Sequence, residues 1–126
     1  MRELTRAEEE VMQVLWKLKK GFVKDILEHF DDPKPAYNTV STIVRILQDK
    51  GFVGHTAYGR THEYFPLVTK EEYSKSHLNS FVNDYFSNSF GKMVSFFARE
   101  NKISLREMEE IMRIMEGEVN KQKTVK

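Results

Sequence analysis

Residues 37–53 read YNTVSTIVRILQDKGFV. Apolar side chains recur in this stretch at the three- and four-residue steps that mark the buried face of an α-helix, and they are Val40, Ile43, Val44 and Leu47. Gly51 stands where a left-handed residue commonly ends a helix. We therefore expect a helix over residues 37–50, with one buried stripe and an outer face of short polar side chains.

Two shorter amphipathic patterns precede this helix. Thr5 and Glu8 form a capping box, in which each side chain bonds the backbone amide of the other residue, and they predict a helix over residues 6–19. A second apolar stripe covers residues 23–30 and ends at DDPKP, because two prolines cannot continue a helix. The chain thus begins with three helices, and a short turn separates the second from the third.

The segment after the third helix has the pattern of a β-hairpin. Residues 52–58 and 61–65 are rich in β-prone side chains, and a glycine turn lies between them. Pro66 has no amide hydrogen to donate to a strand partner, so we expect the pairing to weaken there.

Two histidines flank the turn of this hairpin. With the loop at residues 58–59, His55 and His62 face each other across the strands, whereas with the loop at residues 59–60 they do not pair. Glu63 is the one nearby carboxylate, and we expect no metal site. Both imidazoles are expected to cover DNA backbone or to face solvent.

The C-terminal half has three further helical patterns. Capping boxes that begin at Thr69 and Ser104 open two of them. Gly91 permits a break after the first, and a shorter helix then continues the apolar surface. We expect the last helix to end at Gly117 and the tail, residues 118–126, to fray.

These elements predict a mainly α protein with a small β-hairpin. We expect a winged helix-turn-helix head over residues 1–68 and a C-terminal helical dimerisation arm over residues 69–126. The arm is too short to close a core by itself, yet it is rich in aromatic and apolar residues, so it needs a partner surface. The residues expected at this dimer interface are Leu78, Phe81, Tyr85, Phe86, Phe90, Phe96, Phe97, Met108, Ile111 and Met112.

The order of helices and hairpin predicts how the head binds DNA. In a winged helix-turn-helix, one helix enters the major groove and the hairpin tip reaches the flanking backbone. The chain has 20 basic and 19 acidic residues, so contact with double-stranded DNA must come from local placement of charge. The residues expected to contact DNA are Tyr37, Asn38, Thr39, Ser41, Thr42, Arg45, Gln48, Arg60 and Thr61.

The composition and motifs argue against other classes of protein. The chain has no cysteine, which excludes a disulfide scaffold and a thiolate metal site. It has no constellation of acid, base and nucleophile and no glycine-rich phosphate loop, so we expect neither an enzyme nor a bound cofactor. No apolar run reaches the roughly 18 to 20 residues of a membrane span. We expect a cytoplasmic protein without membrane insertion.

The head also resembles a known family. Residues 37–47, the sequence Lys-Gly-Phe-Val at residues 50–53 and the opening Leu-Thr-x-Ala-Glu-x-x-Val-Met-x-x-Leu-Trp at residues 4–16 are similar to the BlaI/MecI penicillinase-repressor family. Together with the C-terminal helix, the likeness covers about residues 3–117. The resemblance implies a homodimeric, sequence-specific transcriptional repressor that binds a palindromic operator.

The resemblance further implies control by a membrane-bound sensor protease that cuts the repressor in its arm. The matching position is Ser95-Phe96, where the family typically has Asn before Phe. Ordinary helix packing is the alternative interpretation of these two residues. Family members also carry a basic residue where this chain has Ser41 or Ile46, so an operator sequence cannot be transferred.

A second hypothesis belongs to a different functional class. A polar outer face on an amphipathic helix is often only solvated. The chain is then a winged-helix protein–protein interaction module without sequence-specific DNA binding. Salt distinguishes the two hypotheses, because phosphate-driven DNA binding weakens steeply as salt rises.

Overall fold

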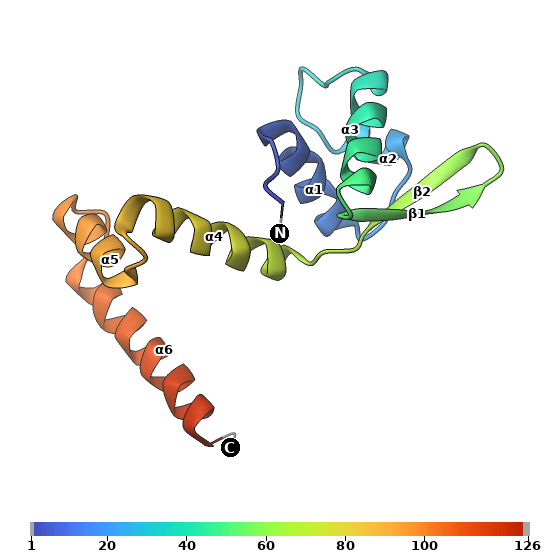
Figure 1. The fold of residues 1–126 in the computed structure, drawn as a ribbon. Helices are drawn as coiled ribbons and strands as arrows, with labels where there is room; N and C mark the ends of the chain where they lie inside the picture. Colours follow the sequence, from blue (N-terminus) through green and yellow to red (C-terminus); the bar gives the residue numbers. More distant parts are fainter. Residues whose placement is uncertain (1, 125–126) are drawn as a thin grey trace. The chain divides into compact units, whose positions relative to one another are not determined.

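A computed structural model describes residues 2–124 of the chain (Figure 1). Its elements follow the order α1 (Arg6–Leu18), α2 (Val23–Glu28), α3 (Tyr37–Asp49), β1 (Val53–Tyr58), β2 (Thr61–Pro66), α4 (Lys70–Phe86), α5 (Phe90–Arg99) and α6 (Leu105–Thr124). The described chain forms two compact units, one ending at Leu78 and the other beginning at Asn79. The predicted mainly α fold with a winged helix-turn-helix and a small hairpin is confirmed.

Side-chain caps fix the starts of α1 and α4. The Thr5 amide donates to Glu8 Oε1 at 3.0 Å, and the Glu8 amide donates back to Thr5 Oγ1 at 3.2 Å. Thr69 and Glu72 repeat this reciprocal pair at 3.2 and 3.0 Å. The predicted capping boxes at Thr5 and Thr69 are confirmed, and each satisfies amides that the first helical turn leaves without a partner. At the third predicted box, the Glu107 amide donates to Ser104 Oγ at 3.1 Å.

The core of the first unit lies where α1, α2 and α3 meet the base of the hairpin. The helical periodicity predicted its α3 stripe, of which Val40, Val44 and Leu47 are fully buried and Ile43 is half-buried. Burying a side chain of this size stabilises a fold by about 1.5–3 kcal/mol. The other fully buried side chains of this core include Val11, Met12, Leu15, Ile26, Phe52 and Val53.

The hairpin, or wing, is held to the helices by a short backbone bridge. Gly21 and Tyr64 exchange two backbone hydrogen bonds, of 2.9 and 2.8 Å, between the α1–α2 connection and β2. At the far end, Tyr58 pairs with Thr61, so the loop is Gly59-Arg60, and Gly59 has the positive φ of 64° that such a turn requires. β2 ends at Pro66, opposite Val53.

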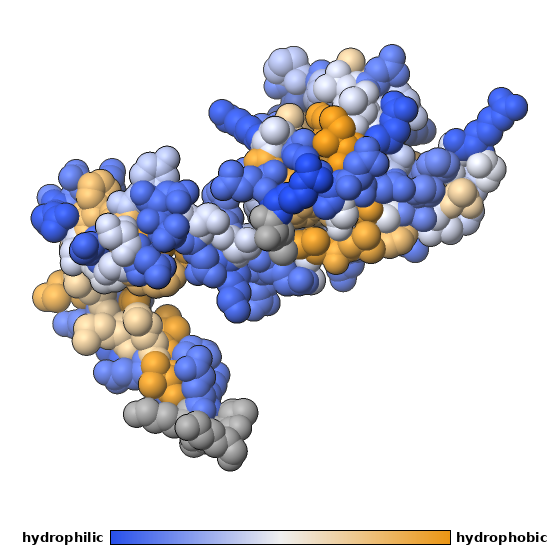
Figure 2. Space-filling model, in the orientation of Figure 1, coloured by the Kyte–Doolittle hydropathy of each residue, from blue (hydrophilic) through white to orange (hydrophobic). Residues whose placement is uncertain are grey.

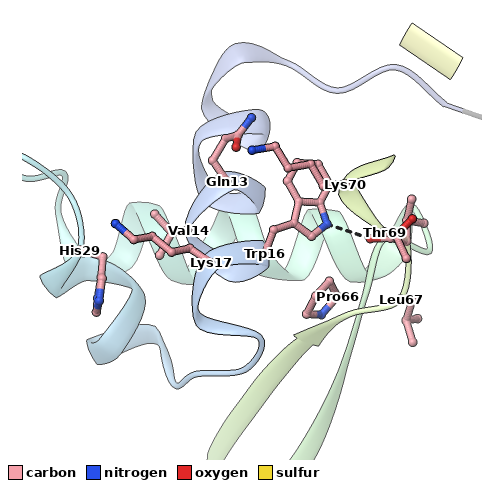
Figure 3. A pocket seen from close by; sticks show the side chains of 10 residues that line it. Gln13, Val14, Trp16, Lys17, His29, Pro66, Leu67, Thr69 and Lys70 are labelled. Atoms are coloured by element: carbon pink, nitrogen blue, oxygen red, sulfur yellow. Dashed lines mark hydrogen bonds between the residues drawn. The ribbon is translucent and has the colours of Figure 1, made fainter. Parts of the chain in front are cut away.

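Trp16 joins the first turns of α4 to the head. Its indole Nε1 donates to the Val68 carbonyl at 2.8 Å, as Figure 3 shows. The Trp16 ring lies 5.9 Å from Tyr73, and Tyr73 lies edge-on to the buried Phe52 at 5.8 Å. These contacts explain why the first unit extends into α4. The groove beside Trp16 contains none of the predicted DNA-binding residues.

Two boundaries in the C-terminal half differ from the sequence-based expectation. The break between α4 and α5 is made by Ser87 and Asn88, both at positive φ, and Gly91 lies inside α5. The α6 helix runs through Gly117 to Thr124, so neither the predicted stop nor the predicted fraying of residues 118–124 is found. One glycine costs a helix only about 1 kcal/mol. Residues 125–126 of the predicted tail lie outside the described range.

Within residues 2–124, no helix is both long enough and apolar enough to cross a membrane.

Candidate nucleic-acid interface

The outward face of α3 is mainly polar, with Ile46 as an exposed apolar side chain, and it has no acidic group before Asp49. The predicted DNA-contacting residues of this helix all lie on it. Tyr37, Asn38, Thr39, Thr42 and Arg45 are exposed, and Ser41 and Gln48 are half-buried. Such short hydroxyl and amide side chains, with one long guanidinium, donate to phosphates and match the donors and acceptors on base edges.

Two of these side chains bond along the helix itself. Thr42 Oγ1 donates to the Asn38 carbonyl at 2.9 Å, and Arg45 Nε donates to the Ser41 carbonyl at 3.3 Å. A guanidinium has five N–H donors, so this bond orients Arg45 and leaves its terminal nitrogens for another acceptor.

A groove separates α3 from the wing. It is lined by Tyr37, Ser41 and Arg45 of α3 and by Arg60, Thr61, His62 and Tyr64 of the wing. Four residues at the start of α2 also line it, and they are Phe22, Val23, Lys24 and Asp25. The groove therefore brings together predicted contact residues of helix and wing that are distant in sequence.

The charge of this groove is mainly positive. Lys24, Arg45 and Arg60 are its cations, whereas Asp25 is the one carboxylate among the described residues that line it. Asp25 Oδ2 already accepts the Phe22 amide at 3.0 Å. Burial raises the pKa of the Tyr64 hydroxyl, and the charge of Arg45 partly opposes this rise. A groove of this kind suits an anionic ligand.

Gln48 has a role that sequence reasoning missed. Its Oε1 accepts a hydrogen bond from His55 Nδ1 at 2.9 Å, so it connects the last turn of α3 to β1. Side-chain partners in different elements leave no periodic signal in the sequence. Gln48 thus orients the wing relative to α3.

The hairpin register decides between the two loop alternatives. Tyr64 lies opposite His55, and His62 lies opposite Ala57, as expected for a loop at residues 59–60. His55 and His62 are therefore diagonal neighbours on one face of the hairpin, and their rings stack at 4.2 Å with an interplanar angle of 10°. In the described part of the chain, no group of three His, Cys, Asp or Glu residues could hold a metal ion.

An ion pair fixes the far end of α3 to α1. Lys50 Nζ donates to Glu8 Oε1 at 2.6 Å, and both side chains are largely buried. Burial by itself raises the pKa of Glu8, but hydrogen bonds from Lys50 and the Thr5 amide, together with the Lys50 charge, outweigh it and lower that pKa below its ordinary value. The sequence identified Glu8 as a cap but not its distant partner.

The predicted dimerisation residues lie on α4, α5 and α6. Exposed members are Leu78, Phe81, Tyr85, Phe90, Phe96, Ile111 and Met112, while Phe86, Phe97 and Met108 are half-buried. Ring contacts of 5.7 Å join Phe86 to Phe81 and to Phe96. Figure 2 shows apolar surface along α6. The predicted cleavage residues, Ser95 and Phe96, lie inside α5, and both are exposed.

Comparisons with known proteins give matches along nearly the whole chain. The chain is 26% identical to the penicillinase repressor of Bacillus licheniformis over 122 residues, which cover 96% of this chain and 95% of that protein. It is 26% identical to the methicillin resistance regulatory protein MecI of Staphylococcus aureus (strain N315), over 90% of this chain and 93% of that protein.

A solved structure and a family model also match. The solution structure of the DNA binding domain of the repressor BlaI is 26% identical, with a TM-score of 0.49, and the match covers 58% of this chain and 94% of that one. The family model described as penicillinase repressor matches residues 4–117. The chain belongs to the penicillinase repressor family.

Proposed function

We propose that the chain is a homodimeric transcriptional repressor in which α3 reads the major groove of a palindromic operator. The observation that carries this proposal is the outer face of α3, which has no acidic group before Asp49 and borders a groove with three cations. In this arrangement Thr42 and Arg45 contact base edges, whereas Arg60 at the wing tip contacts phosphate. Membership of the penicillinase repressor family supports the same assignment.

The second unit supplies the dimer interface in this proposal. Its helices expose large apolar side chains to water, among them Phe90, Phe96 and Met112. Two copies that bury these faces against each other remove the exposed apolar surface. The same association holds two α3 helices at the fixed spacing that a palindrome requires.

Dimerisation also compensates for the weak net charge. The formal net charge of the chain is +1, so one head attracts DNA only through its local groove. Two linked heads bind as one unit, and the gain in affinity is roughly hundredfold or more. A cut at Ser95-Phe96 separates α6 from the head, and this gain is lost without any change in α3.

A selection of duplexes from a random pool, followed by binding measurements, tests the proposal. We expect the selected sequences to be palindromic and their affinity to fall steeply with salt. Thr42→Ala and Arg45→Ala change the preferred sequence, whereas Arg60→Ala weakens binding to all duplexes alike. Lys17→Ala, on α1 and outside the groove, is the matched cation control and leaves binding unchanged.

Two results count against the proposal. Binding that is insensitive to salt, or a selection that enriches no sequence, would favour a protein–protein interaction module. An Arg45→Ala variant with unchanged sequence preference would remove the base-reading role of that side chain.

A further inference from the structure

The histidines of the chain fall into two groups. His55 and His62 stack on each other at 4.2 Å on the face of the wing that carries Tyr64. His29 caps the C-terminal end of α2, and His77 stacks on Tyr73 in α4. Only the first pair belongs to the candidate interface, since His62 lines the groove between α3 and the wing.

The hydrogen bond to Gln48 orients the His55 ring. A carbonyl oxygen can only accept, so in this 2.9 Å bond to Gln48 Oε1 the hydrogen lies on His55 Nδ1. The His62 side chain is exposed to solvent.

The charged groups around the two histidines are mostly cationic, so a ligand that binds beside them is expected to be an anion. Arg45 and Tyr37 face the groove from α3, Lys24 and Asp25 from α2, and Arg60 and Tyr64 from the wing itself. Asp25 is the one carboxylate of this set, and it accepts the Phe22 amide. Glu63 lies next to His62 in the strand, so its side chain points to the opposite face of the hairpin.

A nearby anion favours the charged form of an imidazole. Imidazole side chains commonly take up a proton between about pH 5 and 8. One protonated ring over a neutral ring is stable, whereas two positive rings at this separation repel each other. A phosphate beside the stack favours the protonated form and gains a charge-assisted hydrogen bond from it.

We propose that the His55–His62 stack is a proton-dependent phosphate contact of the wing, which becomes charged when duplex DNA occupies the groove. The inference rests on the proposed DNA-binding function and adds that DNA binding is coupled to the uptake of a proton. Since the bound state holds more protons than the free state, affinity for DNA rises as the pH falls. The histidine pair thus makes the contact between the wing and the DNA backbone sensitive to pH.

Binding of the full-length protein to a labelled duplex of mixed sequence, at fixed ionic strength from pH 6 to pH 8.5, tests the inference. We expect the wild-type affinity to rise about tenfold over this range as the pH falls, the size of one gained charged contact. His62→Gln is expected to lose most of this rise. His29→Gln and His77→Gln, the matched controls, keep the full rise.

Proton uptake gives a second, independent readout. Calorimetric titration of the same duplex at pH 6.5, in buffers of different ionisation enthalpy, measures the protons taken up on binding. The wild type is expected to take up a substantial fraction of one proton, and His62→Gln much less. An unchanged uptake in His62→Gln, or an equal loss of affinity at every pH, would overturn the inference.

The experiment separates failure of this inference from failure of the proposed function. If the wild type binds no duplex at any pH, both fall. If it binds with the expected salt dependence, but His62→Gln and His55→Gln keep the full pH dependence, only the proton-linked contact is wrong.

Discussion

The two units of the chain differ in where they place their apolar side chains. In the first unit, α1 and α3 bury Val11, Leu15, Val44 and Leu47 completely. In the second unit, Val82 is the one buried hydrophobic side chain among the described residues, and large groups such as Met112 are more than half exposed. The first unit therefore closes its own core, whereas the helices of the second unit leave large apolar side chains exposed.

This difference shows that a segment can form amphipathic helices without being able to close a hydrophobic core of its own. Both units contain amphipathic helices with side-chain caps. Only the first adds a hairpin that closes over the helices and a backbone bridge that holds it there. A domain of about 60 residues is already marginal in the surface that it buries, and the second unit, which begins at Asn79, is shorter than that.

The largest expected effect comes from a cavity in the closed core. Leu47 is fully buried, so Leu47→Ala should lower the free energy of unfolding by about 3 kcal/mol. Urea unfolding followed by the fluorescence of Trp16, the single tryptophan of the chain, measures this in the first unit. Met112→Ala, at an exposed position of α6, should leave the same transition within about 0.5 kcal/mol. Equal effects of the two changes would contradict the contrast between the units.

The next effect concerns association rather than folding. Ile111→Asp places a charge on the apolar stripe of α6, so we expect it to produce monomers in sedimentation and to weaken operator binding about hundredfold. Gly117→Asp introduces the same charge away from this stripe and should leave the dimer intact. The Trp16 unfolding transition should be unchanged by both. A dimer that survives Ile111→Asp would place the interface elsewhere.

The ion pair in the first unit predicts a smaller, pH-dependent effect. Glu8→Gln should lower the free energy of unfolding by about 2 kcal/mol at pH 7, because Lys50 loses its partner while largely buried. The pKa of Glu8 is lowered in the folded state, so its contribution is present above the ordinary carboxyl pKa and is lost as the pH falls through the lower folded value. Unfolding measured at decreasing pH from pH 7 should show the difference between the two proteins shrink below the ordinary carboxyl pKa.

An exposed carboxylate in the same helix is the control for this change. Glu10 pairs with Arg6 at 3.6 Å with both side chains exposed, so Glu10→Gln should cost less than about 0.5 kcal/mol at any pH. If Glu10→Gln lowered the free energy of unfolding as much as Glu8→Gln, burial of Lys50 would not be the cause of the Glu8→Gln effect.

Local signals in the sequence were sufficient to predict most of the fold. The capping boxes at Thr5 and Thr69 and the apolar spacing of α3 depend on neighbours within about one helical turn, so they can be predicted from the local sequence. The hairpin was predictable for the same reason, since Gly59 supplies the left-handed residue of its turn. The outer face of α3 then followed as the side opposite the buried stripe.

Contacts between distant residues could not be predicted. Lys50 lies 42 residues from Glu8, and nothing in either neighbourhood indicates the pair. The stack of His55 on His62 depends on the hairpin register, and the sequence allowed two registers. The break at Ser87-Asn88 uses left-handed residues other than glycine, which composition does not reveal.

The smallest expected effect comes from Gly117, which lies on the side of α6 opposite its apolar stripe. Gly117 lies nine residues after Met108, or about two and a half helical turns, so it faces away from the apolar stripe of α6. Apart from its two chain neighbours and the backbone of its own helix, no atom of the described residues lies within 4 Å of where its Cβ would be. Gly117→Ala should therefore stabilise the helix by about 0.5–1 kcal/mol and leave association unchanged. Helix content by circular dichroism and the dimer constant by sedimentation measure the two quantities. Weaker association would mean that a partner approaches this side of α6, and the interface would then include more than the apolar stripe.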